Sequence, residues 1–180
     1  MMKEELYKLK FPIGEFDKPE NITSININKW INDIESFPKR LENMVSELNS
    51  IELNYKYRPG GWKIKQVIHH CADSHMNSLI RFKLALTEET PVIRPYYEDR
   101  FAELPDSLDD NIESSLILLK GLHAKLTSVM KSLTDEDLQK EYLHPEHGEK
   151  FKLEEVVGVY AWHSNHHLAH IEQALERKFS

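Results

Sequence analysis

Apolar residues recur with the helical spacing of three and four positions in four separate stretches of the chain. The stretches run from Trp30 to Leu48, from Ile64 to Leu86, from Ile112 to Leu133 and from Val156 to Ala174. Pro38 lies inside the first stretch, so we expect a kink or a break in that helix. In the third stretch the spacings alternate between four and three, which is typical of a helix packed in a bundle. The pattern therefore predicts an all-α fold, with a four-helix bundle as its architecture.

The connections between these helices differ in length and composition. Residues 90–108, TPVIRPYYEDRFAELPDSL, form a long loop with prolines and aromatics, which we expect to lie over a functional site. Residues Glu141 to Leu153 have two short alternating runs around Pro-Glu-His-Gly and predict a small β-hairpin. Residues 51–58, IELNYKYR, predict another short strand. Because 180 residues is near the usual size of one domain, we expect residues 1–180 to form a single domain.

Composition narrows the class of protein. The net charge of −7 argues against a nucleic-acid partner, because such binding depends on Lys and Arg that neutralise phosphates. The longest apolar runs are too short to span a bilayer, and the charged N-terminus MMKEELYKLKFPIGEF lacks the apolar centre of a signal peptide. The single cysteine, Cys71, cannot form an internal disulfide, which fits a reducing compartment. We therefore expect a cytoplasmic protein whose partner is a small molecule or a protein.

Candidate chemistry is concentrated in the last helix, where YAWHSNHHLAHIEQAL holds four histidines within eight residues. At about 100° of rotation per residue from Val156, His163 and His167 fall on the centre line of the apolar face. His166 falls at the margin of that face, and His170 lies between the two sides. A buried imidazole without a partner costs roughly 1–3 kcal/mol, so the two inward rings need an explanation. Their i, i+4 spacing places them on adjacent turns, which favours a metal ion over a polar cluster.

A metal ion needs at least a third protein ligand. In the second helix, VIHHCADSHMN places His75 near the middle of the apolar stripe, His70 at its edge and His69 outside it. Periodicity alone therefore ranks His75, or His123 of the third helix, as the first candidate. A single histidine on a bundle seam, such as His123, is more often a packed core residue. Cys71 also faces inward and is a further candidate, as a thiolate.

Three strings, GGWKIKQVIHHCADSHMN, RFKLALTEETPVIRPY and YAWHSNHHLAHI, resemble the YfiT branch of the DinB superfamily, which is described as a group of metal-dependent hydrolases. The resemblance extends from Phe11 through the last helix. It implies a DinB-like four-helix bundle that holds one zinc or nickel ion with three histidines. In the family the first ligand follows the Trp that opens the second helix by eight positions, which gives His70 when counted from Trp62. The other two ligands are the pair of the last helix, His163 and His167. The resemblance thus selects His70 over the periodicity ranking.

Three imidazoles on a divalent ion leave one coordination position open, as in catalytic rather than structural zinc sites. A water in that position would have a pKa near about 7, which is the chemistry of a metal-dependent hydrolase. A small thiol bound there as thiolate would instead make the protein a thiol S-transferase, and some relatives are regarded as bacillithiol transferases. A third hypothesis is a non-catalytic binding or stress protein that the metal ion only stabilises. The resemblance also suggests a homodimer.

The sequence does not identify a general base, because WHSNH lacks the glutamate of the HExxH metalloproteases. Asp73, one turn from His70, could orient that ring as a carboxylate behind the ligand, although a solvated carboxylate is an equal alternative. Weak candidates for binding an anionic group of the substrate are Arg81, Arg94, Tyr96 and Tyr97.

Overall fold

Four long helices form the body of the molecule, and the structure, a computed structural model, describes residues 3–180. The long helices are α2 (Ser24–Val45), α4 (Ile64–Thr87), α6 (Glu113–Lys131) and α8 (Leu153–Arg177). They coincide with the four apolar-periodic stretches, so the predicted bundle is confirmed. Short elements fill the connections: α1 (Lys3–Lys10), α3 (Ser50–Leu53), α5 (Glu98–Phe101), α7 (Asp135–Leu138), β1 (Glu141–His144) and β2 (Glu149–Lys152). None of the helices in residues 3–180 is both long and apolar enough to cross a membrane.

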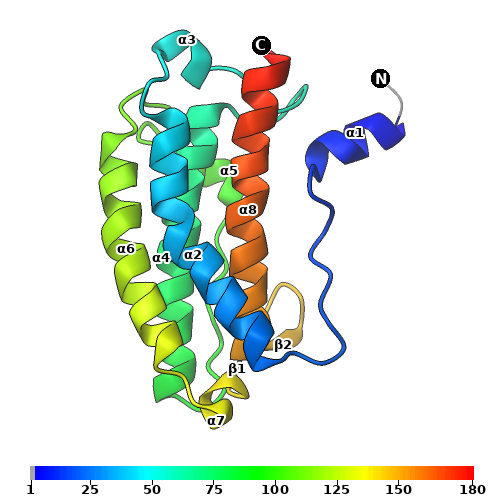
Figure 1. Ribbon diagram of the computed structural model, residues 1–180, viewed down its shortest axis with the longest axis vertical. Coiled ribbons are helices and arrows are strands. Elements are labelled where there is room, and N and C mark those ends of the chain that lie inside the picture. Colours follow the sequence, from blue (N-terminus) through cyan, green and yellow to red (C-terminus); the bar gives the residue numbers. More distant parts are fainter. Residues whose placement is uncertain (1–2) are drawn as a thin grey trace.

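The order of the helices around the bundle differs from their order along the chain. Helix α2 packs against α6 and α8, and α4 packs against the same two helices. In Figure 1, α2 and α8 run upward while α4 and α6 run downward. Since the consecutive helices α2 and α4 lie diagonally across the bundle, the antiparallel neighbour of α4 is α8. Helices α4 and α8, which carry most of the histidines, therefore pack directly against each other.

The core divides into two apolar clusters. One cluster contains Ile31 and Phe82 and lies where α2 begins, and the other contains Leu41 and Ile68 and lies where α2 ends. Buried histidines lie where the two clusters meet: His75 separates their residues on α4, and His163 and His167 separate them on α8. Helix α2 continues through Pro38 without a break, and its axis changes direction near its middle in Figure 1. The expected kink is thus present as a bend in an unbroken helix.

The connections agree with the sequence in part. The predicted hairpin is confirmed, with Glu141 paired to Lys152 in an antiparallel register. The strand predicted over residues 51–58 is wrong: Asn49 caps a helical turn, α3, by accepting hydrogen bonds from the amides of residues 51 and 52. Only Lys56 pairs in a strand-like way, in isolated bridges. The long loop 90–108 contains α5 and is held to the hairpin by a bridge between Val92 and Leu143.

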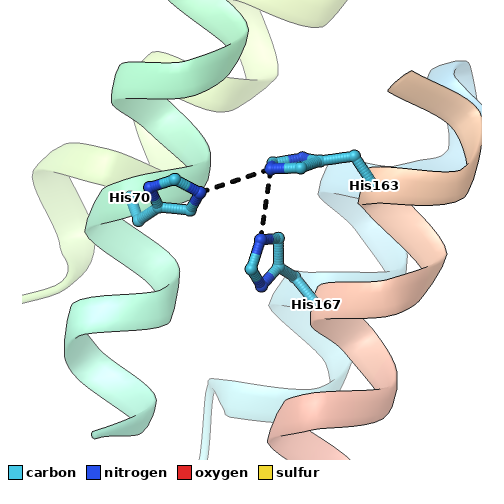
Figure 2. A group of neighbouring side chains, drawn as sticks. All are labelled: His70, His163 and His167. Carbon is cyan, nitrogen blue, oxygen red and sulfur yellow. Dashed lines mark hydrogen bonds between the residues drawn. The ribbon is translucent and has the colours of Figure 1, made fainter. Parts of the chain in front are cut away.

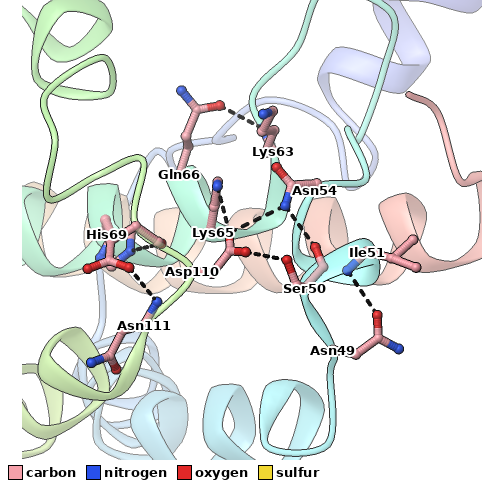
Figure 3. Close-up of polar contacts among 11 residues, drawn as sticks. Asn49, Ser50, Ile51, Asn54, Lys63, Lys65, Gln66, His69, Asp110 and Asn111 are labelled. Atoms are coloured by element: carbon pink, nitrogen blue, oxygen red, sulfur yellow. Dashed lines mark hydrogen bonds and ion pairs between the residues drawn. The ribbon is translucent and has the colours of Figure 1, made fainter.

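A polar network fixes the first turns of α4 (Figure 3). Lys65 is buried, and its Nζ lies 2.6 Å from Oδ1 of Asp110. One turn further on, Nδ1 of His69 lies 2.8 Å from the hydroxyl of Ser115 at the start of α6. His69 is therefore buried, although the helical periodicity placed it outside the apolar stripe, because the segment that leads into α6 covers it. These contacts fix the first turns of α4 against the segment that leads into α6.

The N-terminal segment lies along the outer side of α8 (Figure 1). The Trp162 indole donates a hydrogen bond of 3.0 Å to the Gly14 carbonyl, and His170 Nε2 lies 3.0 Å from the Lys10 carbonyl oxygen. Phe16 approaches α8 at Gly158, where an added Cβ would lie only 2.7 Å from its ring. The segment thus covers histidines that would otherwise face solvent.

Candidate metal centre

Three imidazole rings from two helices converge at one point of the bundle (Figure 2). Nε2 of His163 lies 3.1 Å from Nε2 of His167 and 3.3 Å from Nε2 of His70, and the donor atoms of all three residues lie within 4.8 Å of one another. Two nitrogens that each lie about 2.05 Å from a tetrahedral ion are roughly 3.3 Å apart. The spacing of the three rings therefore suits a single ion.

The charge state of these rings also suits a metal ion. His70 and His167 are buried, and His163 is partly exposed on the cavity described below. Burial lowers the pKa of His70 to about 4. Burial, reinforced by the neighbouring imidazoles, holds the pKa of His163 and of His167 well below the ordinary value. All three rings are thus neutral near pH 7, as metal ligation requires, and imidazole is a donor that suits zinc and nickel.

His75 and His123, which periodicity ranked first as the third ligand, lie behind this group. Nε2 of His75 is 2.9 Å from Nδ1 of His163, and Nδ1 of His75 is 2.6 Å from Nε2 of His123. Both ring nitrogens of His75 therefore contact other histidines, on the side of His163 away from His70 and His167. The donor group found in residues 3–180 contains His70 in their place.

The two other candidates on α4 do not join the group. Cys71 is buried on the inward side as expected, but it packs in the apolar cluster with Ile68, and burial raises the pKa of its thiol. Asp73 is half-buried, and burial followed by repulsion from Asp106 raises the pKa of its carboxyl group. Among the hydrogen bonds of residues 3–180, none joins the Asp73 carboxylate to His70. An orienting role for Asp73 stays a prediction without a supporting contact.

A cavity of about 380 Å³ lies in front of the three histidines. Helices α4 and α8, the hairpin and the N-terminal segment all contribute to its wall. Trp62 lies beside the histidines, with its ring centroid 4.7 Å from that of His70. Because His70 and Arg81 are separated by eleven positions on α4, the cavity extends for about 16 Å along that helix. It is therefore long enough to hold a small molecule whose one end reaches the histidines.

Arg81 is the cation at the end of this cavity remote from the histidines. Its Nε atom is buried and has no hydrogen-bond partner in the described part of the protein. Tyr142, His144 and Glu98 line the same part of the wall. Burial raises the pKa of the Glu98 carboxyl group, while Arg81 acts in the opposite direction. Arg81 is thus a cation on the cavity wall that keeps one unused donor.

The other residues expected to bind an anionic group are placed differently. Arg94 and Tyr97 are exposed and do not line the cavity. Tyr96 is half-buried beside Ser74, and burial raises the pKa of its phenol. Among the four candidates, the structure therefore brings only Arg81 to the wall of the cavity.

Most of the residues that line the cavity were not predicted from the sequence. Phe11 and Lys10 come from the N-terminal segment, and Glu98 comes from α5. These contributions join segments that are far apart in the chain, so no local pattern announces them. The hairpin carries a signal that the sequence does show, because His144 and His147 flank its Pro-Glu turn. Both of these histidines line the cavity.

Comparisons with known proteins place the chain in a family. Residues 33–171 match the family model described as DinB superfamily. A protein of Oceanobacillus iheyensis named "Putative metal-dependent hydrolase OB0782" is 50% identical over 169 residues, which cover 94% of this chain and 97% of that protein. "Putative metal-dependent hydrolase YfiT" of Bacillus subtilis is 46% identical over 169 residues, with 94% of this chain and 95% of that protein covered.

A solved structure agrees with these relatives. It carries the description "YfiT from Bacillus subtilis is a probable metal-dependent hydrolase with an unusual four-helix bundle topology". It superposes with a TM-score of 0.91 at 45% sequence identity, covering 96% of this chain and 99% of that chain. The chain therefore belongs to the DinB superfamily, and the resemblance drawn from its motifs is confirmed.

The neutral state of His123 makes stability depend on pH. His123 is 2% exposed, and burial lowers its pKa from 6.5 to about 4. Below pH 6.5 the unfolded chain binds a proton at this residue that the native protein does not bind, so stability falls as the pH falls. Between pH 7.5 and 5 this group should remove about 2 kcal/mol from the free energy of unfolding.

Urea unfolding of the metal-free protein at several pH values measures this effect. In His123→Leu the loss between pH 7.5 and 5 should be smaller than in the wild type by that amount. His147→Leu, which removes an exposed histidine, is the control and should leave the pH dependence as it is. An unchanged slope in His123→Leu would contradict the assignment.

Proposed function

We propose that this member of the DinB superfamily is a metal-dependent hydrolase of a small-molecule substrate, and that His70, His163 and His167 hold one divalent ion, zinc or nickel. The observation that carries the proposal is the convergence of the three Nε2 atoms at spacings that one ion can bridge. The names of the relatives, which describe metal-dependent hydrolases, support the same chemistry. When bound, the ion would supply the Lewis acidity that activates water at neutral pH.

The residues of the chain have separable tasks in this proposal. The three imidazoles would hold the ion through neutral nitrogens, beside the cavity. Trp62 and Phe11 line the cavity with apolar surface that limits access of bulk water. Arg81 binds an anionic group at the other end of the substrate, which orients the bond to be hydrolysed toward the histidines. Glu98 is the acidic side chain on the cavity wall within residues 3–180.

The cavity in front of the histidines favours catalysis over a purely structural metal site. In a structural site a fourth protein ligand closes the coordination sphere. Here the donor group found in residues 3–180 has three members, and it opens on a space of about 380 Å³. A metal ion that only stabilised the fold would not need such a space beside it.

Thiol transfer is the second candidate, because it uses the same open position. A low-molecular-weight thiol would lose its proton to solvent on binding, and its sulfur would form a bond to the electrophile while the leaving group of the electrophile departs. Because the thiolate is itself the nucleophile, the attack would need no separate general base. Within residues 3–180 the one carboxylate on the cavity wall is that of Glu98, which interacts with Arg81 at the end remote from the three histidines, and this favours the alternative. The cytoplasmic location and the homodimer stay predictions from the sequence.

The ligand assignment predicts unequal effects of two neighbouring substitutions. His163→Ala removes a proposed ligand and should lower bound metal from about one ion per chain to near zero. His166→Ala is the matched control, because His166 is buried on the same helix but stacks on Trp162, with ring centroids 4.5 Å apart. Elemental analysis after mild purification measures both variants. Equal losses from the two substitutions would refute the assignment.

The choice between hydrolysis and thiol transfer predicts a difference in co-substrate. A hydrolase should turn over activated esters or amides without thiol, and chelation of the metal should abolish that turnover. A transferase should instead consume thiol and electrophile in equal amounts and leave the ester intact. Both reactions can be followed with the zinc-loaded and the nickel-loaded protein. Turnover that is unaffected by metal removal would exclude both mechanisms.

The position of Arg81 predicts a preference for anionic substrates. Arg81→Met keeps the aliphatic stem but removes a charged donor, which should cost about 1.5–3 kcal/mol, or roughly 10–100-fold in kcat/KM, for a substrate with a carboxylate. A neutral substrate of the same size should be affected much less. Arg94→Met is the control, since Arg94 is exposed outside the cavity. Equal losses for charged and neutral substrates would show that Arg81 binds no anionic group.

A further inference from the structure

The backbone carbonyl of Ile34 has lost its usual partner. In an α-helix it would accept a hydrogen bond from the amide of residue 38, but residue 38 is proline and has no N–H. Nδ1 of His123 lies 2.6 Å from this carbonyl oxygen instead. Because a carbonyl oxygen can only accept, the Nδ1 atom of His123 must carry the proton.

This proton fixes the protons of two further rings. A neutral imidazole has one donor and one acceptor nitrogen, and His123 and His75 are fully buried rings whose recorded hydrogen-bond partners are all uncharged, so both are neutral. Nε2 of His123 therefore accepts from Nδ1 of His75, at 2.6 Å. Nε2 of His75 in turn accepts from Nδ1 of His163, at 2.9 Å. This chain of hydrogen bonds ends at His163, which has a proton on Nδ1 and a free lone pair on Nε2.

A shorter chain of hydrogen bonds supports the ring of His167 in the same way. Nε2 of His170 lies 3.0 Å from the Lys10 carbonyl oxygen and must donate to it. Nδ1 of His170 is then an acceptor, and Nδ1 of His167 lies 3.4 Å from it. Nε2 of His167 is left without a proton. Each of the two chains therefore begins at a backbone carbonyl and ends at an Nε2 lone pair that faces the third histidine, His70.

We propose that these two chains are positioning devices that fix His163 and His167 in the Nδ1–H tautomer and aim both Nε2 lone pairs at one point. His75, His123 and His170 are thereby positioning residues. Their purpose rests on the proposed metal site, but the tautomers belong to the metal-free protein and can be measured there. The nitrogen that binds a metal is set by the hydrogen bond of the other ring nitrogen, and loss of such a partner commonly lowers metal affinity about 10–100-fold.

Two substitutions break the longer chain at different points. His75→Phe keeps an aromatic ring beside Phe37 and Tyr160 but removes the acceptor for the Nδ1 proton of His163. Pro38→Ala touches no ring, and it restores an amide that competes with His123 for the Ile34 carbonyl. His75→Gln is the rescue variant, because its amide oxygen can accept where Nε2 of His75 does. His69→Phe is the matched control. His69 is a buried histidine of the same helix, and both of its ring nitrogens have hydrogen-bond partners that do not belong to this chain of hydrogen bonds.

The first readout is the tautomer of His163 in the metal-free protein, from the ¹⁵N chemical shifts of its ring at pH 7.5. The wild type and His69→Phe should show a protonated Nδ1 and an unprotonated Nε2. His75→Phe should show a mixture of tautomers, with Pro38→Ala shifted in the same direction. A protonated Nε2 of His163 in the wild type, or an unchanged spectrum in His75→Phe, would overturn the proposal.

The second readout is the affinity for Zn²⁺, measured by competition with a chromogenic chelator. His75→Phe should bind zinc about 10–100-fold more weakly than the wild type, and His75→Gln should recover most of the loss. Equal losses in His75→Phe and His69→Phe would overturn the positioning role, because they would indicate a general structural effect. A wild type that binds no zinc would refute the proposed function, and the ring spectra would still decide the tautomers.

Discussion

The structure depends on one requirement, namely that uncharged imidazoles buried in a helical bundle must each find partners for both ring nitrogens. Five connected histidines have a partner at both ring nitrogens, namely His75, His123, His163, His167 and His170, and His70 joins them through its Nε2 atom. Most of their ring nitrogens contact another histidine or a backbone carbonyl. At three of them, the Nε2 atoms of His70, His163 and His167, the only contacts recorded in residues 3–180 are with each other. A cation would satisfy all three at once, and nothing else in the described structure does.

The helix order gives this arrangement its geometry. Because α2 and α4 lie diagonally across the bundle, α4 is an antiparallel neighbour of α8, and His70 can meet the pair on α8. Pro38 has a second effect besides the bend of α2, because its missing N–H leaves the Ile34 carbonyl free for His123. The proline inside α2 thus allows a hydrogen bond from the His123 ring of α6. The same α4–α8 seam continues as the cavity toward Arg81, so the proposed metal site and the proposed substrate space share their walls.

The sequence predicted these features unevenly, for physical reasons. The inward facing of His163 and His167 follows from helical rotation alone, and the structure agrees. Periodicity misjudged α4 because it ranks residues by their distance from the bundle axis, whereas the three histidines meet at the seam between two helices. His70 therefore lies at the edge of the stripe, and only family resemblance selected it. The short strand at residues 51–58 failed because local side-chain bonds from Asn49 favoured a helical turn. The burial of His166 and His170 depends on the N-terminal segment, whose path no local pattern reveals.

The most direct test of this account is the position of the ion in crystals of the zinc-loaded protein, located by anomalous scattering at the zinc edge. The account predicts one ion per chain, with Nε2 of His70, His163 and His167 each about 2.0–2.1 Å away and the remaining position facing the cavity. An ion held elsewhere, coordination through Nδ1, or a fourth protein ligand that closes the site would contradict it.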